Sequence, residues 1–180
     1  IIEGGKGDDF LFGQGGEDTL NGGSEEDTLL GGSGNDILIG GDHSDTLIGG
    51  LGNDILTGGT LSDDNHTDTF VWQRGDTGTD HIVDFNITDD KLDLSDLLHG
   101  VSAEELAEYL DFSFDNTTNT TTIAINTHSQ GEVEQYITLD GVDLRDELNL
   151  LSDDLETTII QGLLGNNGDG ALIIDSTESS

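Results

Sequence analysis

A nine-residue unit repeats without a gap from Gly4 to Asp63. The six full units are GGKGDDFLF, GQGGEDTLN, GGSEEDTLL, GGSGNDILI, GGDHSDTLI and GGLGNDILT, and a seventh begins as GGTLSD at Gly58. Every full unit has glycine at its first position, aspartate at its sixth and leucine at its eighth. A fixed short period of this kind restricts the chain to a stack of similar units, because no single unit can bury its apolar side chain alone.

Each unit is predicted to contain a turn and a short strand. Glycine tolerates positive φ in the turn, and the following triplet, such as Ile37-Leu38-Ile39, favours β structure. Side chains alternate across a strand, so the eighth position turns to one side and fills the interior. The leucines at this position are Leu11, Leu20, Leu29, Leu38, Leu47 and Leu56. Two units then form one coil of 18 residues, with strands on opposite walls and successive turns on opposite edges.

The stacking predicts rows of carboxylates along both edges. The first edge contains Asp18, Asp36 and Asp54, and the second edge contains Asp9, Asp27, Asp45 and Asp63. Neighbouring strands lie about 4.8 Å apart, and calcium binds oxygen at about 2.3 to 2.6 Å. Two stacked carboxylates can therefore bind one ion, with turn carbonyls completing its ligands. Calcium is favoured over magnesium because magnesium retains several of its water ligands.

The charge of the chain also indicates a cationic partner. Four Lys and Arg residues stand against 39 Asp and Glu, a formal net charge of −35. Such self-repulsion opposes compaction and makes nucleic acid and anionic membranes poor partners. No apolar run approaches the roughly 20 residues that span a bilayer, and the absence of cysteine gives no sign of disulfides.

The repeat resembles the repeats-in-toxin (RTX) nonapeptide, G-G-x-G-x-D-x-U-x. The resemblance implies a parallel β-roll, a right-handed β-helix with several calcium ions between turns on the same edge. The fourth position is glycine throughout the first edge, but Glu25, His43 and Leu61 replace it on the second edge. We therefore expect firm calcium sites on the first edge and weaker ones on the second. Further candidate calcium ligands are Gly16, Gly34, Gly52, Asn35, Asn53, Asp68, Asp80 and Asp84.

The composition changes after Trp72, which predicts a β-roll over residues 1–72 and a β-rich cap over 73–180. Strands are expected over 80–85 and 91–95, where they cover the open end of the roll. Asp80, Asp84, Asp90 and Asp93 could hold a further calcium, although a role as surface residues is as plausible. A capping box at Ser102 predicts a helix over 103–110. Further strands are expected over 112–114, 121–125 and 133–139, a second helix from Ser152 through Leu163, and an apolar strand in the final ten residues.

The C-terminal part resembles the type I secretion target domain that follows RTX repeats in large Gram-negative adhesins. The matching segments are residues 68–72, 75–80, 84–85, 91–98, 139–144 and 171–175. The resemblance implies an uncleaved secretion signal for an ATP-binding transporter, its membrane-fusion adaptor and an outer-membrane pore. We therefore expect a monomeric fragment of a longer adhesin, secreted or on the cell surface, that stays unfolded at low cytosolic calcium and folds outside.

Other functions remain open from sequence alone. His43 among carboxylates could suggest zinc, but a single imidazole is more typical of a solvent-facing substitution. An enzyme is disfavoured, because no nucleophile, base and orienting group recur together, although a secreted enzyme could contain the same module. Ice binding is disfavoured by the irregular third positions. Binding of glycans or surface polymers by residues 100–150 stays an alternative.

Overall fold

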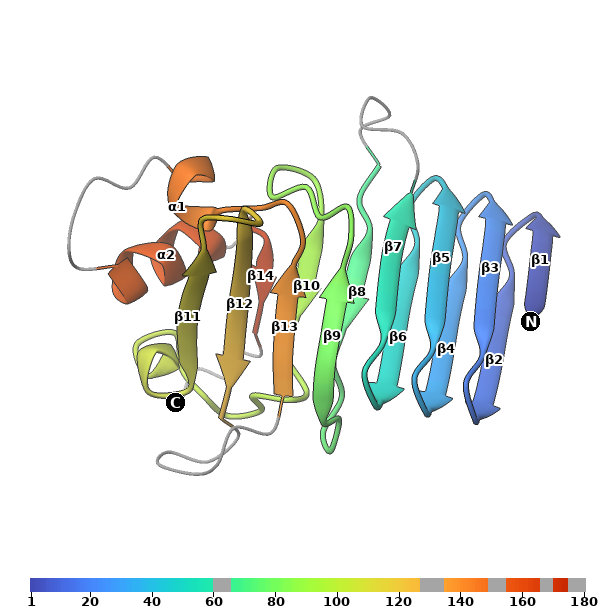
Figure 1. Ribbon diagram of the computed structural model, residues 1–180, viewed down its shortest axis with the longest axis horizontal. Coiled ribbons are helices and arrows are strands. Elements are labelled where there is room, and N and C mark those ends of the chain that lie inside the picture. Colours follow the sequence, from blue (N-terminus) through green and yellow to red (C-terminus); the bar gives the residue numbers. More distant parts are fainter. Residues whose placement is uncertain (60–65, 127–134, 149–154, 166–169, 175–180) are drawn as a thin grey trace.

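The computed structural model describes residues 1–59, 66–126, 135–148, 155–165 and 170–174. It is a mainly β parallel solenoid in which the chain winds between two sheets (Figure 1). The predicted mainly β roll is thereby confirmed. The strands of the winding part are β1 (Ile2–Lys6), β2 (Phe10–Gly15), β3 (Thr19–Ser24), β4 (Thr28–Ser33), β5 (Ile37–Asp42), β6 (Thr46–Leu51), β7 (Ile55–Gly59), β8 (Thr69–Val71), β9 (Gly78–Ile82) and β10 (Lys91–Asp93).

The 18-residue coil follows directly from the strand register. Among β1 to β10, odd-numbered strands pair in parallel in one sheet and even-numbered strands pair in parallel in the other. Leu20 lies opposite Leu38 and Leu38 opposite Leu56 in the first sheet, while Leu29 lies opposite Leu47 in the second. These leucines are at most 1% exposed. The eighth position therefore forms the interior, as its spacing predicts.

The glycine pair, however, does not form the turn. Strand β5 continues through Gly40 and Gly41 to Asp42, and the turn lies at positions four to six of each unit. The fourth glycine lies in the turn, as expected of the glycines, whereas the pair belongs to the preceding strand, where the first glycine leaves space. A Cβ on Gly40 would collide with the carboxylate of Asp45 and with the carbonyl oxygen of Gly58. Positive φ occurs at the second position, as in Gly41, and at the fourth.

Both sheets continue beyond the repeats. Ile82 lies opposite Leu56 and Leu139 opposite Ile82 in one sheet, and Phe70, Leu92 and Leu172 extend the leucine row in the other. The additional strands are β11 (Leu110–Asp115), β12 (Thr120–Ile125), β13 (Gln135–Leu139) and β14 (Leu172–Ile173). β13 pairs with β9 in parallel, and β12 and β11 then follow in antiparallel order. The boundary predicted after Trp72 thus falls inside two continuous sheets.

Two short α-helices lie at the end opposite the first coil (Figure 1). They are α1 (Leu144–Glu147), which Asp143 caps, and α2 (Leu155–Leu164). The helix expected through Leu163 is confirmed over its described part, and Ile159, Ile160 and Leu163 are buried. The start of that prediction, 152–154, lies outside the described residues.

The helix predicted over 103–110 was wrong. Only one 3₁₀ turn forms, η1 (Leu106–Glu108), and Leu110 already begins β11, where it pairs with Ile125. The capping contact itself exists, since Glu105 accepts hydrogen bonds from the backbone N–H and the hydroxyl of Ser102. The local sequence favours a helix after Ser102, but the pairing of Leu110 with β12 prevents the helix from extending. Within the described residues, no helix has the length and apolar character to cross a membrane.

Candidate calcium-binding edges

The sixth-position aspartates form a hydrogen-bonded ladder along each edge. The backbone N–H of each one donates to Oδ1 of the aspartate one coil further along the chain. On the first edge, Asp18 donates to Asp36 at 2.7 Å and Asp36 to Asp54 at 2.8 Å. On the second edge, Asp9 donates to Asp27 at 2.7 Å and Asp27 to Asp45 at 2.8 Å. The side chains of one row therefore stack as the sequence predicts.

Residues outside the nine-residue period extend both ladders. On the first edge, Asp54 donates to Asp80 Oδ1 at 2.8 Å. On the second edge, Asp45 donates to Asp68 Oδ1 at 2.9 Å, and Asp68 to Asp90 Oδ1 at 3.2 Å. Asp68 thus takes the place that the period assigns to Asp63, which lies outside the described residues.

The second oxygen of these carboxylates is what a cation would bind. Oδ2 is buried and has no hydrogen-bond partner in Asp9, Asp27, Asp36, Asp45 and Asp54. A buried anionic oxygen without a donor is costly, because it has lost water and gained nothing in return. The residues present therefore fit calcium, which prefers carboxylate and carbonyl oxygens and accepts six to eight of them.

Side chains alone do not complete such a site. Over the described part of the chain, no three His, Cys, Asp or Glu side chains gather closely enough to hold a metal. Other oxygens are therefore needed, and turn carbonyls, which the sequence predicts as ligands, are a type that calcium readily accepts.

Burial dominates the electrostatics of the ladders. It raises the pKa of Asp45 and of Asp54 to about 7, although a backbone N–H bonded to each carboxylate partly opposes the shift. Neighbouring carboxylates of the same edge raise the pKa further, Asp68 beside Asp45 and Asp80 beside Asp54. Burial also raises the pKa of Asp27 and Asp36. Without a cation, Asp45 and Asp54 are therefore only partly ionised near neutral pH.

The two edges differ at the fourth position. On the first edge, Gly34 and Gly52 have φ of +123° and +130°, and a Cβ on either would overlap a backbone carbonyl of the turn stacked against it. On the second edge, Glu25 and His43 have φ of +78° and +82°, a conformation that side chains with a Cβ resist. The strain expected from the missing glycines is therefore present in the backbone.

Hydrogen bonding across the turns shows the same difference. The fourth-position N–H of Gly16 donates to the Ser33 carbonyl at 2.8 Å, and that of Gly34 to the Leu51 carbonyl at 2.8 Å. On the second edge, Gly7 donates to Ser24 at 3.2 Å, while Glu25 does not bond the equivalent carbonyl of Asp42. The greater calcium affinity of the first edge stays a prediction, now supported by its closer backbone packing.

The candidate ligands Asn35 and Asn53 form a second ladder on the first edge. Asn35 Oδ1 accepts the N–H of Asn53 at 2.9 Å, and Asn53 Oδ1 accepts the N–H of Thr79 at 2.8 Å. This ladder runs opposite to the aspartate ladder, since the donor here is the residue later in the chain. Both side chains thus hold successive turns together without charge.

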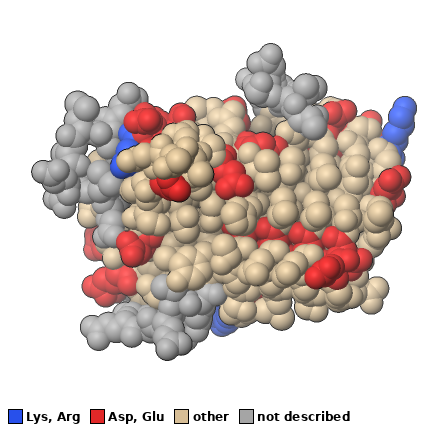
Figure 2. Space-filling model, viewed as in Figure 1, with Lys and Arg blue, Asp and Glu red and all other residues tan. Residues whose placement is uncertain are grey.

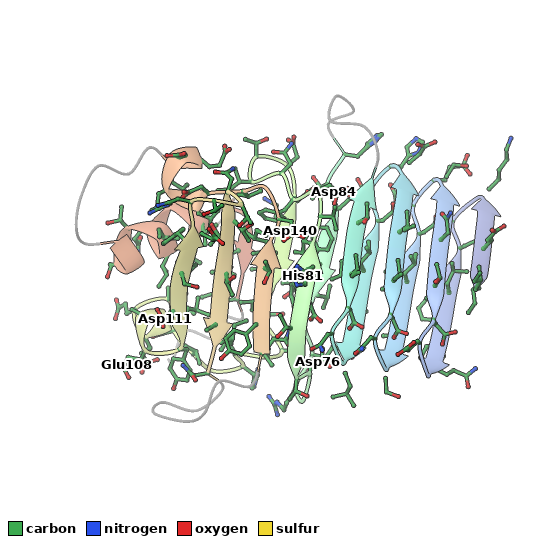
Figure 3. The ribbon with its side chains drawn as sticks, viewed as in Figure 1. Asp76, His81, Asp84, Glu108, Asp111 and Asp140 are labelled. Atoms are coloured by element: carbon green, nitrogen blue, oxygen red, sulfur yellow. The ribbon has the colours of Figure 1, made fainter. Side chains whose placement is uncertain are left out.

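The four carboxylates proposed as one further calcium site do not come together. Asp80 lies on the first edge and Asp90 on the second, so that hypothesis was wrong. Asp84 lies beyond β9 at the end opposite Asp76 (Figure 3), where the N–H groups of Gly58 and Gly59 donate to its two oxygens at 3.0 and 3.1 Å. The insertion and new turns after the repeats break the spacing on which the hypothesis depended.

The histidines form no metal or catalytic cluster within the described residues. The ring of His43 stacks on that of His66, with centroids 4.6 Å apart. His81 lies beside Asp140 across β9 and β13 (Figure 3), with Nδ1 3.2 Å from Oδ1 and both side chains about half exposed. Among the described residues, the ring of His81 bonds only to Asp140, so no nucleophile and base are paired there.

Acidic side chains follow the repeats on the face shown in Figure 2, where Asp and Glu form a row and Lys and Arg are sparse. Two residues at the end of the first-edge aspartate ladder, Trp72 and Gln135, were missed as site residues. Trp72 Nε1 donates to Asp80 Oδ2 at 2.8 Å and Gln135 Nε2 donates to the same atom at 2.7 Å. No sequence signal connects Gln135 to Asp80, which is 55 residues away.

Comparison with known proteins supports these assignments. Residues 1–29, 22–56 and 30–63 match the RTX calcium-binding nonapeptide repeat family. No curated protein matches the chain. The solution structure of the AlgE6R3 subunit from the Azotobacter vinelandii mannuronan C5-epimerase is similar, with a TM-score of 0.59 and 25% identity over 93% of this chain and 83% of that chain. The AlgE6R2 subunit of the same enzyme matches with a TM-score of 0.44 and 29% identity over 78% and 83% of the two chains.

Proposed function

We propose that this chain, whose residues 1–63 are RTX calcium-binding nonapeptide repeats, is the C-terminal module of a large secreted adhesin. It directs export by a type I secretion system and folds on binding calcium outside the cell. The observation that supports the calcium-dependent step is the row of buried carboxylate oxygens without partners.

The physical basis is the balance between charge and burial. Folding brings Asp36 and Asp54 into one buried row of like charge, and their Oδ2 atoms have no protein donor. Bound calcium supplies positive charge and links the carboxylates to turn carbonyls. The repeat coils therefore stay expanded where calcium is scarce and fold where it is plentiful, because a ligand that binds only the folded state stabilises it by mass action.

This coupling suits export through a narrow channel. Expanded repeats can thread a pore, whereas the stacked coils cannot. The end of the chain that emerges first would fold first, oppose backward movement and provide the stack on which later coils assemble.

A calcium titration followed by far-UV circular dichroism tests the folding step. The spectrum in chelator should gain β structure with calcium and should not do so with magnesium at equal ionic strength. Asp54→Asn, which keeps a hydrogen-bond acceptor and loses the charge, should shift the midpoint to at least tenfold higher calcium. Asp42→Asn removes the same charge from an exposed side chain and should leave the midpoint within twofold. A spectrum that calcium does not change would refute the proposal.

An export assay tests the secretion step separately. A reporter fused to the N-terminus of this chain should reach the medium only when transporter, adaptor and pore are present together. Removal of residues 166–180 should abolish export. Equal export with and without those residues would contradict the presence of a C-terminal signal.

A second candidate is a non-catalytic module of a secreted polysaccharide-modifying enzyme, which the similarity to a mannuronan C5-epimerase subunit favours. Mannuronan is a polyanion, and only four Lys and Arg are present to bind it. Calorimetry with mannuronan and with a neutral glycan, in calcium, separates the two candidates. Saturable binding of mannuronan would favour the enzyme module, and its absence favours the adhesin.

A further inference from the structure

Asp80, the last aspartate of the first-edge ladder, has different hydrogen-bond partners from the repeat aspartates Asp36 and Asp54. In Asp36 and Asp54, Oδ1 accepts one backbone N–H and Oδ2 has no partner. In Asp80, which is fully buried, Oδ1 accepts the Asp54 N–H and Oδ2 accepts both Trp72 Nε1 and Gln135 Nε2. Three N–H groups therefore surround the last carboxylate of this row.

Two further carboxylates beyond the repeats also accept a backbone N–H on each oxygen. Asp84 accepts the N–H groups of Gly58 and Gly59, one on each oxygen. Asp90, at the end of the second edge, accepts the Asp68 N–H on Oδ1 and the Asn86 N–H on Oδ2 at 2.8 Å. Hydrogen bonds of this kind favour the ionised carboxylate and offset part of the effect of its burial without a metal.

We propose that the solenoid has a calcium-independent end, in which Trp72 and Gln135 supply to Asp80 the stabilisation that the repeat aspartates obtain from calcium. This inference rests on the proposed calcium-dependent folding of the repeats. The cap comprises β8 to β13 and stays folded in chelator, while the coils of β1 to β7 require calcium.

The position of these residues makes the cap a template for folding. β9 presents an edge to β7, and β8 presents an edge to β6. The backbone of Trp72 is also bonded within the cap, because its N–H donates to the carbonyl of Asp93 in β10 at 3.0 Å. A folded cap thus exposes one strand edge in each sheet, β9 in one and β8 in the other. The calcium-dependent strands pair with these edges in order, beginning with β7 and β6 and ending with β1.

Trp72 is the only tryptophan in the chain and is 2% exposed, so it reports directly on the cap. In chelator at pH 7.5, its emission should stay blue-shifted and protected from acrylamide, while far-UV circular dichroism shows loss of the repeats. Amide exchange should be slowed roughly 100-fold or more in β9 and β13 and nearly unprotected in β3 to β7. Solvent exposure of Trp72 in chelator would overturn the proposal.

Gln135→Glu tests the assignment to these donors. The substitution replaces an N–H donor with a carboxylate beside Asp80, so the cap should lose the protection of Trp72 in chelator and regain it with calcium. Gln73→Glu makes the same change at an exposed neighbour of Trp72 and should leave Trp72 protected in chelator. If both variants keep Trp72 protected in chelator, the donors are not what stabilises the cap.

The outcomes separate this inference from the proposed function. Repeats that fold with calcium while Trp72 is exposed in chelator would leave the function intact and refute the calcium-independent cap. A protected Trp72 with repeats that do not respond to calcium would refute the proposed function and leave a metal-free cap.

Discussion

Glycine has three separate roles within one repeat. At the first position it leaves room for the returning aspartate, as Gly40 does for Asp45. At the second and fourth positions it adopts positive φ, and on the first edge the fourth glycine also lies against the carbonyl of the adjacent turn. The non-glycine residues at these positions, Gln14, Glu25 and His43, keep positive φ of 79°, 78° and 82°. The period therefore imposes the backbone conformation even where the residue is unsuited to it.

Substitution of these glycines should distinguish conformation from close packing. Gly52→Ala introduces a Cβ that overlaps the Gly34 carbonyl at a φ of +130°, so we expect the free energy of unfolding in calcium to fall by roughly 2 to 4 kcal/mol. Gly7→Ala has a φ of +95° and its nearest neighbour, Glu25 Oε2, is 4.0 Å away, so about 1 kcal/mol is expected. Urea unfolding measures both. Equal losses would show that close packing of the turns contributes nothing.

At the scale of the elements, the two edges are built from the same unit but differ in how closely their turns pack and how many hydrogen bonds join them. The first edge has close glycine contacts, fourth-position hydrogen bonds and the Asn35 and Asn53 ladder. On the second edge, Glu25 has positive φ and lacks the hydrogen bond that Gly34 makes. The coils that contain Glu25 and His43 therefore each have one well-ordered turn and one strained turn.

Restoring glycine on the second edge should repair that turn. Glu25→Gly keeps the positive φ but removes the Cβ that makes it costly. The free energy of unfolding in calcium should therefore rise by roughly 0.5 to 1 kcal/mol. Glu25→Gln removes the same charge and keeps a Cβ, so it should recover less than half of this gain. Thermal unfolding of both variants provides the comparison. A full gain in Glu25→Gln would attribute the effect to charge repulsion and would contradict the strain argument.

At the scale of the whole molecule, the buried carboxylates connect stability to pH. Burial raises the pKa of Asp45, Asp54 and Asp90 to about 7 and that of Asp80 to about 6, above the ordinary value of 3.8. The folded state therefore holds more protons than the unfolded state between about pH 4 and 7. Without calcium, this contribution is fully present below pH 4 and is lost as pH rises toward 7.

The calcium-free chain should accordingly be more stable at pH 5 than at pH 8. Because the calcium-free repeats are proposed to be largely unfolded, the fraction of β structure in metal-stripped buffer, measured by far-UV circular dichroism at each pH, gives the difference. Apparent calcium affinity should change in the opposite direction, rising with pH because the carboxylates must lose protons before they bind a metal. A calcium-free stability that rises between pH 5 and pH 8 would contradict the burial of these groups.

Sequence alone determined the repetitive part of this protein. The period, the interior leucines, the two parallel sheets and the carboxylate rows all follow from local spacing, because every repeat has nearly the same neighbours one coil away. The part of α2 that the structure describes also agrees with its pattern of Ile159, Ile160 and Leu163.

Only the tertiary structure decided what happens where the period ends. Asp68 continues the second edge although five extra residues precede it. Asp80 in β9 accepts hydrogen bonds from Trp72, which follows β8, and from Gln135 in β13. Leu110 joins β11 because Ile125 lies opposite it, whatever its local helical preference. These contacts join residues with no regular spacing, so their energies depend on distances that the folded chain alone creates.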